Sequence, residues 1–291
     1  MAAADPIDLL HGGSPRTIGC YLLETEGGLA LFDCGPSSCL PALKAGLADL
    51  GHELGDLTQL LLSHIHLDHA GAAGSLVRAH PGLQVWVSEI GAPHLVDPSR
   101  LERSARRLYG DAFDELWGEL APVPEANVNV ATDRAVGLEV FPAPGHASHH
   151  LCYFDGSTLY AGDAAGVRIQ PSKSVLPPTP PPDVDVEAWY RTLEQIEQRA
   201  PERLALIHFG IADDVSRHLA ELRDRLDTWS RRVEQGAGEQ EFIEAARHDL
   251  PPADAEAYDR AMPFWQSYAG LKRYWDTRSL PGPAGHEPAP A

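Results

Sequence analysis

The chain has 291 residues, of which 43% are hydrophobic and 22% are charged, a balance typical of soluble globular proteins. Its 23 lysines and arginines against 42 aspartates and glutamates give a formal net charge of −19, which argues against non-specific nucleic-acid binding because such binding depends on neutralising phosphates. No apolar run approaches the roughly 20 residues of a membrane-spanning helix, and the N-terminus has neither the basic segment nor the apolar core of a secretory signal, so we expect a cytoplasmic protein without nucleic-acid or membrane partners.

The first part of the chain, up to about residue 89, alternates short apolar runs with turn signals. Helices are expected after Pro36 and over Gly71–His80. Strands are expected at Ile18–Leu23, Leu29–Asp33, Thr58–Ser63 and Val85–Ser88. This alternation indicates a sheet covered by helices.

Residues 90–125 are predicted to be an insertion, because prolines punctuate the segment around one helical stretch, Ser99–Leu120. Arg100, Arg103 and Arg107 share one face of that helix. They are suited to holding an anionic substrate, since the guanidinium fork matches carboxylates and phosphates. The alternative, which we favour, is a solvated face whose charge is balanced by neighbouring acidic residues.

Strand signals resume after the insertion, at Asn127–Val130, Gly137–Phe141, His150–Phe154, Thr158–Tyr160 and Leu204–Ile207. Between them, Pro171–Pro182 contains six prolines. Such a segment cannot form a helix or a central strand, and we expect it to run extended over the surface. Helical spacing returns from Val186 to Ile196.

After Gly210 the strand signals stop, and apolar residues from Val215 to Val233 follow one helical stripe, with Asp213 or Asp214 as a candidate cap. A second helical region, Gln240–Trp275, is broken by prolines and rich in aromatic residues. We expect these aromatics to pack on the main domain; a homodimer contact or one wall of a substrate pocket is the alternative. The predicted division is a main domain over 1–212, a helical extension over 213–278 and a disordered tail over 279–291.

The segment that carries chemistry is Ser63–His69, which has the pattern H-x-H-x-D-H directly after an apolar strand. Its candidate metal ligands are His64, His66, Asp68 and His69. Three imidazoles and a carboxylate this close would repel one another on protonation, and their burial without a partner would cost desolvation energy. A divalent cation removes both problems, so the cluster predicts a metal site.

Three further candidate ligands each follow a predicted strand: His146, Asp163 and His208. Loops at one edge of a sheet can converge on one point, and the strands hold their roots in place. Five histidines and two aspartates suffice for two metal ions. His149 and His150 lie beside His146 and either orient a ligand or are ordinary packed and exposed histidines.

The ordered set H64-I-H66-L-D68-H69, G145-H146, G162-D163 and H208 resembles the metallo-β-lactamase superfamily, over roughly residues 7–210. The resemblance implies an αββα sandwich, here with a C-terminal helical extension. It also implies one metal bound by His64, His66 and His146, a second bound by Asp68, His69 and His208, and Asp163 bridging them. The stretch around His146 is similar to glyoxalase II-like and lactonase-like members, although no clear glutathione-binding signature accompanies it.

The expected function is therefore a dinuclear metal-dependent hydrolase in which a hydroxide shared by the metals attacks a small ester, lactone or thioester. Asp68 has a second, catalytic candidacy because it can orient the nucleophile. Zinc suits this ligand set, and manganese or iron is also compatible. The alternatives are a phosphodiesterase of the same fold, a mononuclear iron oxygenase of the persulfide-dioxygenase type, and a non-catalytic metal-binding module.

The four cysteines are Cys20, Cys34, Cys39 and Cys152, and no pair has C-x-x-C spacing. We expect reduced thiols in or near the core.

Overall fold

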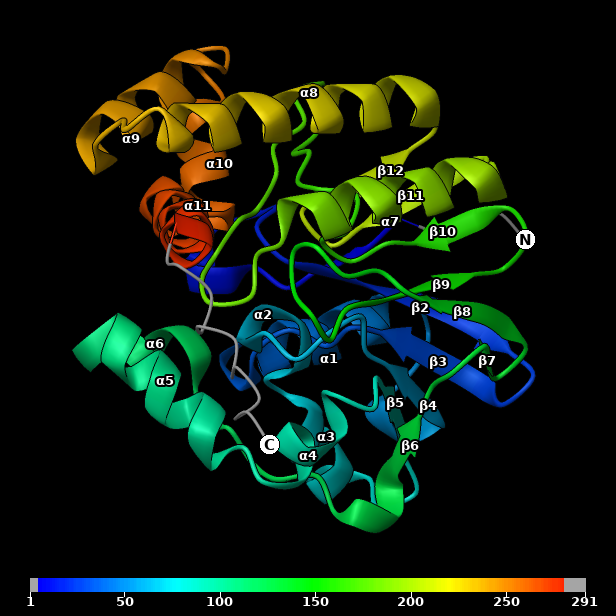
Figure 1. Cartoon of the computed structure of the whole chain (residues 1–291). Helices are drawn as coiled ribbons and strands as arrows, with labels where there is room; N and C mark the ends of the chain where they lie inside the picture. The colour runs from blue at the N-terminus through cyan, green and yellow to red at the C-terminus, as the bar shows by residue number, and fades with distance from the viewer. Residues whose placement is uncertain (1–4, 280–291) are drawn as a thin grey trace, which may run out of the picture.

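Two six-stranded β-sheets pack face to face, with helices on their outer sides (Figure 1). The computed structural model describes residues 5–279. Aromatic side chains join the sheets: the ring of Phe32 lies 5.8 Å from that of Tyr153 and 5.5 Å from that of Tyr160. The predicted αββα sandwich is confirmed, and the first core lies between its two sheets.

The first sheet has the order β1-β2-β3-β4-β5-β6. Its strands are β1 Ile7–Asp8, β2 Gly19–Thr25, β3 Gly28–Phe32, β4 Gln59–Leu61, β5 Gln84–Val87 and β6 Val128–Val130. Strands β1 to β3 are antiparallel, and β3 to β6 run parallel. Parallel neighbours direct their carboxyl ends to one edge of the sheet, and the H-x-H-x-D-H segment leaves β4 at that edge.

The second sheet has the order β12-β11-β10-β9-β8-β7. Its strands are β7 Arg134–Ala135, β8 Leu138–Pro142, β9 Leu151–Phe154, β10 Thr158–Tyr160, β11 Arg203–Leu206 and β12 Gly210–Ala212. Only the β10–β11 pair is parallel among the described strands of this sheet. The expectation that strands end at Gly210 is wrong, because β12 follows and pairs with β11. The short strands β1 and β7 were not predicted.

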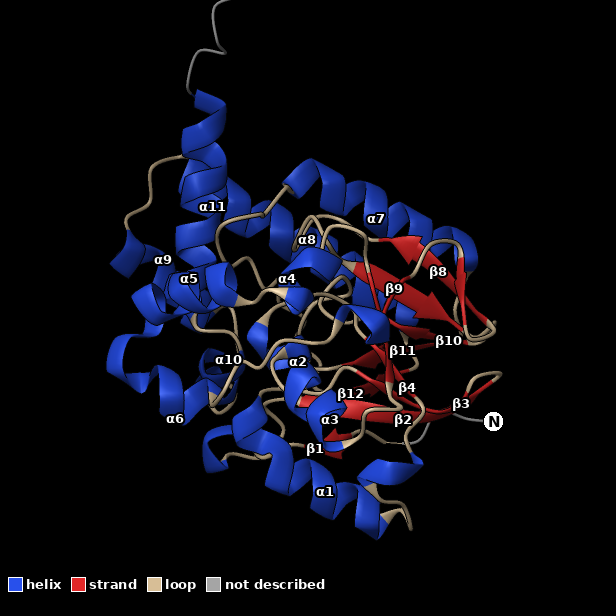
Figure 2. Cartoon of the chain, turned by 90° about the horizontal axis from the view of Figure 1, so that it is seen from below, coloured by secondary structure: helices blue, strands red, loops and turns tan. Residues whose placement is uncertain are grey.

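The helices lie above, below and to the left of the sheets in Figure 2, and the right-hand edge of the sheets is left to strands and loops. The helices are α1 Leu40–Asp49, α2 Leu67–Ala70, α3 Ala73–Ala79, α4 Ala92–Val96, α5 Ser99–Tyr109, α6 Phe113–Trp117, α7 Val186–Arg199, α8 Val215–Glu234, α9 Glu239–His248, α10 Ala255–Ala261 and α11 Phe264–Ser279. Helices α1, α3 and α4 contribute buried leucines to the first core, and α7 and α8 cover the second sheet to form the second core.

Helices α7 and α8 each follow an aspartate, but only the first of these aspartates caps its helix. Asp185 caps α7, its side chain accepting a 2.9 Å hydrogen bond from the Ala188 backbone nitrogen. Helix α8 buries the predicted stripe from Leu219 to Val233. Asp214 precedes α8 without capping it, because its carboxylate pairs with the guanidinium groups of Arg168 and Arg217 instead.

The C-terminal helices pack on the second core, as expected. The Trp229 ring in α8 lies 5.1 Å from Phe242 in α9 and 6.0 Å from Phe264 in α11. The proposed domain division at about residue 212 stays a prediction. Of the tail expected over 279–291, only Ser279 is described, as the last residue of α11; the rest lies outside the described residues.

The proline-rich segment differs from its prediction. Residues 175–179 are buried rather than spread over the surface, because α8 packs near Val175 and α11 covers Thr179. The Thr179 hydroxyl donates to the Ser267 carbonyl at 3.0 Å. At Gly270 a Cβ atom would lie 2.0 Å from the Thr179 carbonyl oxygen, so only glycine allows this approach.

The helical stretch predicted over Ser99–Leu120 is two helices rather than one, since a 3-10 turn at Gly110–Ala112 separates α5 from α6. All four cysteines are buried free thiols, as predicted. Within residues 5–279, no helix combines the length and apolar character required to cross a bilayer.

Candidate metal centre

The structure brings all seven predicted ligand residues together between the two sheets. His64 and His66 lie in the loop after β4, and Asp68 and His69 lie in the short helix α2. The others come from loops of the second sheet, His146 after β8, Asp163 after β10 and His208 after β11. Four separate segments thus meet at one edge of the sandwich.

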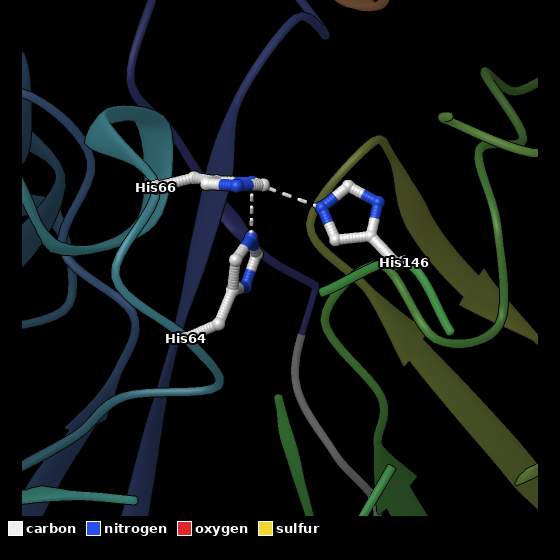
Figure 3. A group of neighbouring side chains, drawn as sticks. All are labelled: His64, His66 and His146. Atoms are coloured by element: carbon white, nitrogen blue, oxygen red, sulfur yellow. Dashed lines mark hydrogen bonds between the residues drawn. The ribbon is translucent and has the colours of Figure 1, made fainter. Parts of the chain in front are cut away.

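His64, His66 and His146 form the first group (Figure 3). Nδ1 of His66 lies 2.9 Å from Nε2 of His64 and 2.9 Å from Nε2 of His146. His64 and His146 are buried, and His66 is partly exposed. Three ring nitrogens therefore converge on one point.

Asp68, His69 and His208 form the second group. Oδ2 of Asp68 lies 3.7 Å from Nε2 of His69 and 3.4 Å from Nε2 of His208. The two histidines are fully buried, whereas the Asp68 side chain keeps 23% of its surface exposed. This carboxylate is therefore the member of the group that solvent can reach.

Asp163 lies between the two groups and faces both. Its Oδ2 is 3.3 Å from Nε2 of His146 in the first group. Its Oδ1 is 3.5 Å from Nε2 of His69 and 3.6 Å from Nε2 of His208 in the second. One carboxylate can thus contribute one oxygen to each group.

In four histidines Nδ1 lies within hydrogen-bond distance of an oxygen atom, which leaves Nε2 directed into the centre. They are His64, His69, His146 and His208. Nδ1 of His146 donates to the Pro178 carbonyl at 2.8 Å, and Nδ1 of His208 donates to the Thr17 carbonyl at 2.6 Å. A proton held on Nδ1 leaves Nε2 with its lone pair directed into the centre. The buried proline-rich segment thus sets the orientation of a candidate ligand.

Asp33 is the important residue that the sequence reasoning missed. Its side chain is fully buried and accepts three hydrogen bonds of 2.7 Å, from the backbone and the hydroxyl of Ser63 and from Nδ1 of His69. Burial raises the pKa of the Asp33 carboxyl, and His69 and Ser63 oppose that rise. The available signal was a carboxylate placed directly after the buried strand β3.

The electrostatics of the centre fit a divalent cation. Burial and the neighbouring histidines lower the pKa of His64 and His66 well below the usual range, so both rings are neutral and able to ligate. Burial alone would raise the pKa of Asp163, but His69, His146 and His208 hold it well below its usual range. Among the described residues, Nε2 of His69 and Oδ1 of Asp163 are buried without a hydrogen-bond partner. A metal ion would supply what both atoms lack.

The two additional histidines lie behind the first group. Nε2 of His150 accepts a 3.1 Å hydrogen bond from the backbone nitrogen of Asp163, so this ring helps to position the loop of Asp163. The His149 ring lies 5.5 Å from that of His66, and burial lowers the pKa of His149 to about 4. Both histidines are buried, which the expectation of one exposed histidine did not anticipate.

A pocket of about 540 Å³ opens above the centre. His66, Asp68, Asp163 and His208 line it on the side of the two groups. Its outer walls come from α5 and α6 and from α10 and α11, which lie at the same end of the sheets in both views (Figures 1 and 2). Of the three arginines considered above, Arg107 lines this pocket, whereas Arg100 and Arg103 do not.

Comparison with known proteins identifies the sequence family. The model of the metallo-beta-lactamase superfamily matches residues 14–208. The protein ST1585 of Sulfurisphaera tokodaii, which has a metallo-beta-lactamase fold, is 25% identical over 206 residues, which are 68% of this chain and 74% of that protein. Its crystal structure superposes with a TM-score of 0.62, covering 92% of this chain and 96% of that one.

Two further relatives carry information about chemistry. An N-acyl homoserine lactonase of Bacillus thuringiensis is 24% identical over 224 residues, which are 66% of this chain and 80% of that enzyme. The structure of TTHA1623 in a di-iron-bound form is 26% identical and has a TM-score of 0.55, covering 75% of this chain and 96% of that one.

Proposed function

This chain belongs to the metallo-beta-lactamase superfamily, and from that premise we propose that it is a metal-dependent hydrolase that carries two metal ions and acts on a small ester, lactone or thioester. The observation that carries the proposal is the position of Asp163, whose two carboxylate oxygens face two separate groups of nitrogen and oxygen donors. The lactonase and the di-iron-bound protein among its relatives support the reaction class and the number of metals.

In this proposal His64, His66 and His146 hold one ion, Asp68, His69 and His208 hold the other, and Asp163 binds both. Zinc is the expected metal because imidazole and carboxylate ligands suit it, and iron or manganese is chemically compatible. When bound, the pair would supply Lewis acidity and lower the pKa of a water molecule towards neutrality.

The side chains of the centre have separable roles in this reaction. Asp68 is the solvent-accessible carboxylate beside His69 and His208, so it can accept a hydrogen bond from the attacking water and hold it towards the substrate. Three histidine rings are fixed by hydrogen bonds from Nδ1. The acceptors are the Asp33 carboxylate for His69, the Pro178 carbonyl for His146 and the Thr17 carbonyl for His208. Because the ring positions are set before substrate binds, little reorganisation is needed during the reaction.

The test uses the full chain purified without added metal or chelator and a panel of esters, lactones, thioesters and phosphodiesters. We expect hydrolysis of one of the first three classes, its loss on chelation and its return when zinc is added. Asp68→Asn should reduce kcat by about 100-fold or more while the fold remains intact by circular dichroism. Turnover of phosphodiesters alone, or oxygen consumption with persulfides, would contradict the proposed reaction.

A further inference from the structure

We propose that the pocket above the metal-binding groups selects substrates whose acyl part is an uncharged, apolar chain, and that helices α5, α6, α10 and α11 determine this selectivity. The inference rests on the proposed hydrolase function and names the substrate class for the same site.

The walls of the pocket are predominantly apolar where they lead away from the centre. Leu101, Ala105 and Leu108 of α5 form one side, together with Leu116 and Trp117 of α6. Ala261, Met262 and Pro263 face them from the junction of α10 and α11. A volume of about 540 Å³ lies within the range of small-molecule sites. Such a space favours an apolar chain, since each buried methylene gains hydrophobic free energy.

The charged groups of the pocket do not form a site for an anionic chain. Arg107 and Arg260 are the only arginines or lysines among the described residues that line it. Arg260 is paired with Glu256 at 2.6 Å, and Arg107 is exposed on the surface of α5. Away from the metal-binding groups, a carboxylate on the chain would therefore meet apolar walls and one exposed arginine.

A hydrogen bond joins the two helical walls and leaves donors for a neutral acceptor. Nε2 of Gln266 in α11 donates to the Tyr109 hydroxyl in α5 at 3.1 Å. Because that oxygen accepts, its own proton remains for an acceptor on the substrate, and burial keeps it there by raising the pKa of Tyr109 to about 12. Nε1 of Trp117 is buried and has no acceptor within residues 5–279. Both groups are neutral donors, so the wall can bind a carbonyl oxygen without supplying a positive charge.

This selectivity is a property of this chain and not of the superfamily motifs. The wall formed by residues 260–267 lies entirely outside the segment 14–208 that matches the family model. The opposite wall is the predicted insertion. Variation in these two segments can therefore change the substrate without disturbing the metal-binding groups.

The first experiment measures kcat/KM for 4-nitrophenyl esters from acetyl to decanoyl with the metal-loaded full chain. We expect a rise of about fourfold per added methylene until the pocket is filled, corresponding to the transfer free energy of one buried methylene. A second readout is the affinity for butan-2-one and decan-2-one, which are uncharged and not hydrolysed, by calorimetry. Decan-2-one should bind at least 100-fold more tightly.

Matched variants assign the effect to the pocket. Leu108 is 42% exposed and lines the pocket, and Leu50 is 47% exposed at the end of α1 and does not. Leu108→Asp should lower kcat/KM for the octanoyl ester about tenfold more than for the acetyl ester, whereas Leu50→Asp should change neither. Arg107→Ala should preserve the chain-length dependence.

The outcomes separate this inference from the proposed function. Hydrolysis that is equally fast for acetyl and decanoyl esters, or that prefers chains ending in a carboxylate and loses this preference in Arg107→Ala, would overturn the pocket assignment and leave the hydrolase standing. No hydrolysis of any panel member by protein that carries its metals would overturn the proposed function itself, whether or not the ketones bind.

Discussion

Asp33 provides a sharp test of how the centre is held, because it belongs to neither metal-binding group and yet accepts a hydrogen bond from His69. One carboxylate oxygen accepts from the Ser63 backbone nitrogen, and the other accepts from the Ser63 hydroxyl and from Nδ1 of His69. In Asp33→Asn one of these oxygens becomes an NH₂ group. If that group faces the Ser63 backbone, two donors oppose each other. If it faces His69, the ring must accept at Nδ1 and carry its proton on Nε2, where it blocks ligation.

The expected loss of metal affinity follows from the free energy of the hydrogen bond that orients His69. A hydrogen bond to a charged group contributes about 1.5–3 kcal/mol, and loss of the partner that orients a ligating histidine weakens metal binding about 10–100-fold. These two ranges agree, since a tenfold change corresponds to about 1.4 kcal/mol. Asp33→Asn should therefore weaken binding at the Asp68, His69 and His208 group by about 10–100-fold.

The assay is a competitive zinc titration against a chromophoric chelator, with thermal unfolding measured on the same samples. The matched control is Asp249→Asn, which removes another partly buried aspartate that pairs with Arg225 and Arg232 far along the chain from the centre. The control should lose stability but keep wild-type zinc affinity. Wild-type affinity in Asp33→Asn, or an equal loss in the control, would refute the reasoning.

Three further predictions follow from the same contacts. His66→Ala and Asp163→Ala should each lose metal and activity together, and wild-type metal content by elemental analysis in either variant would contradict the ligand assignment. Gly270→Ala should lower the free energy of unfolding by about 1–3 kcal/mol, because its Cβ would lie 2.0 Å from a backbone oxygen of the buried proline-rich segment. Gly55→Ala, whose Cβ would meet only Oε1 of Glu53 at 3.8 Å, is the control in denaturant titrations. Burial opposes ionisation of Asp214, but Arg168 and Arg217 lower its pKa to about 2, so its ion pairs stabilise the fold above pH 4 and are lost as the pH falls towards 2. In Asp214→Asn the free energy of unfolding should fall less over that interval, by less than about 1 kcal/mol. An unchanged pH dependence would show that the ion pairs contribute nothing.

The sequence predicted the fold and family because the informative residues lie close together in it. His64, His66, Asp68 and His69 fall within six positions after one apolar strand, and their spacing is visible without tertiary information. The helical stripe from Val215 to Val233 was predicted for the same reason, since its period is local.

The errors concern features that depend on distant parts of the chain. Thr179 is buried because α11, about ninety residues later in the chain, packs on it. The proline-rich composition of its own segment carries no information on that contact and therefore indicated an exposed segment. Strand β12 has three residues and exists because β11 pairs with it. Asp33 carries no local signal that links it to His69, because the two residues meet only when the end of β3 and helix α2 lie side by side.

The central claim is that Asp163 joins two metal-binding groups. It is tested most directly by counting the metal ions bound per chain, by elemental mass spectrometry on protein purified without added metal or chelator, in the wild type and in Asp163→Ala. We predict close to two ions, zinc foremost, in the wild type and a substantial loss in the variant. A single ion in the wild type, or an unchanged count in the variant, would contradict it.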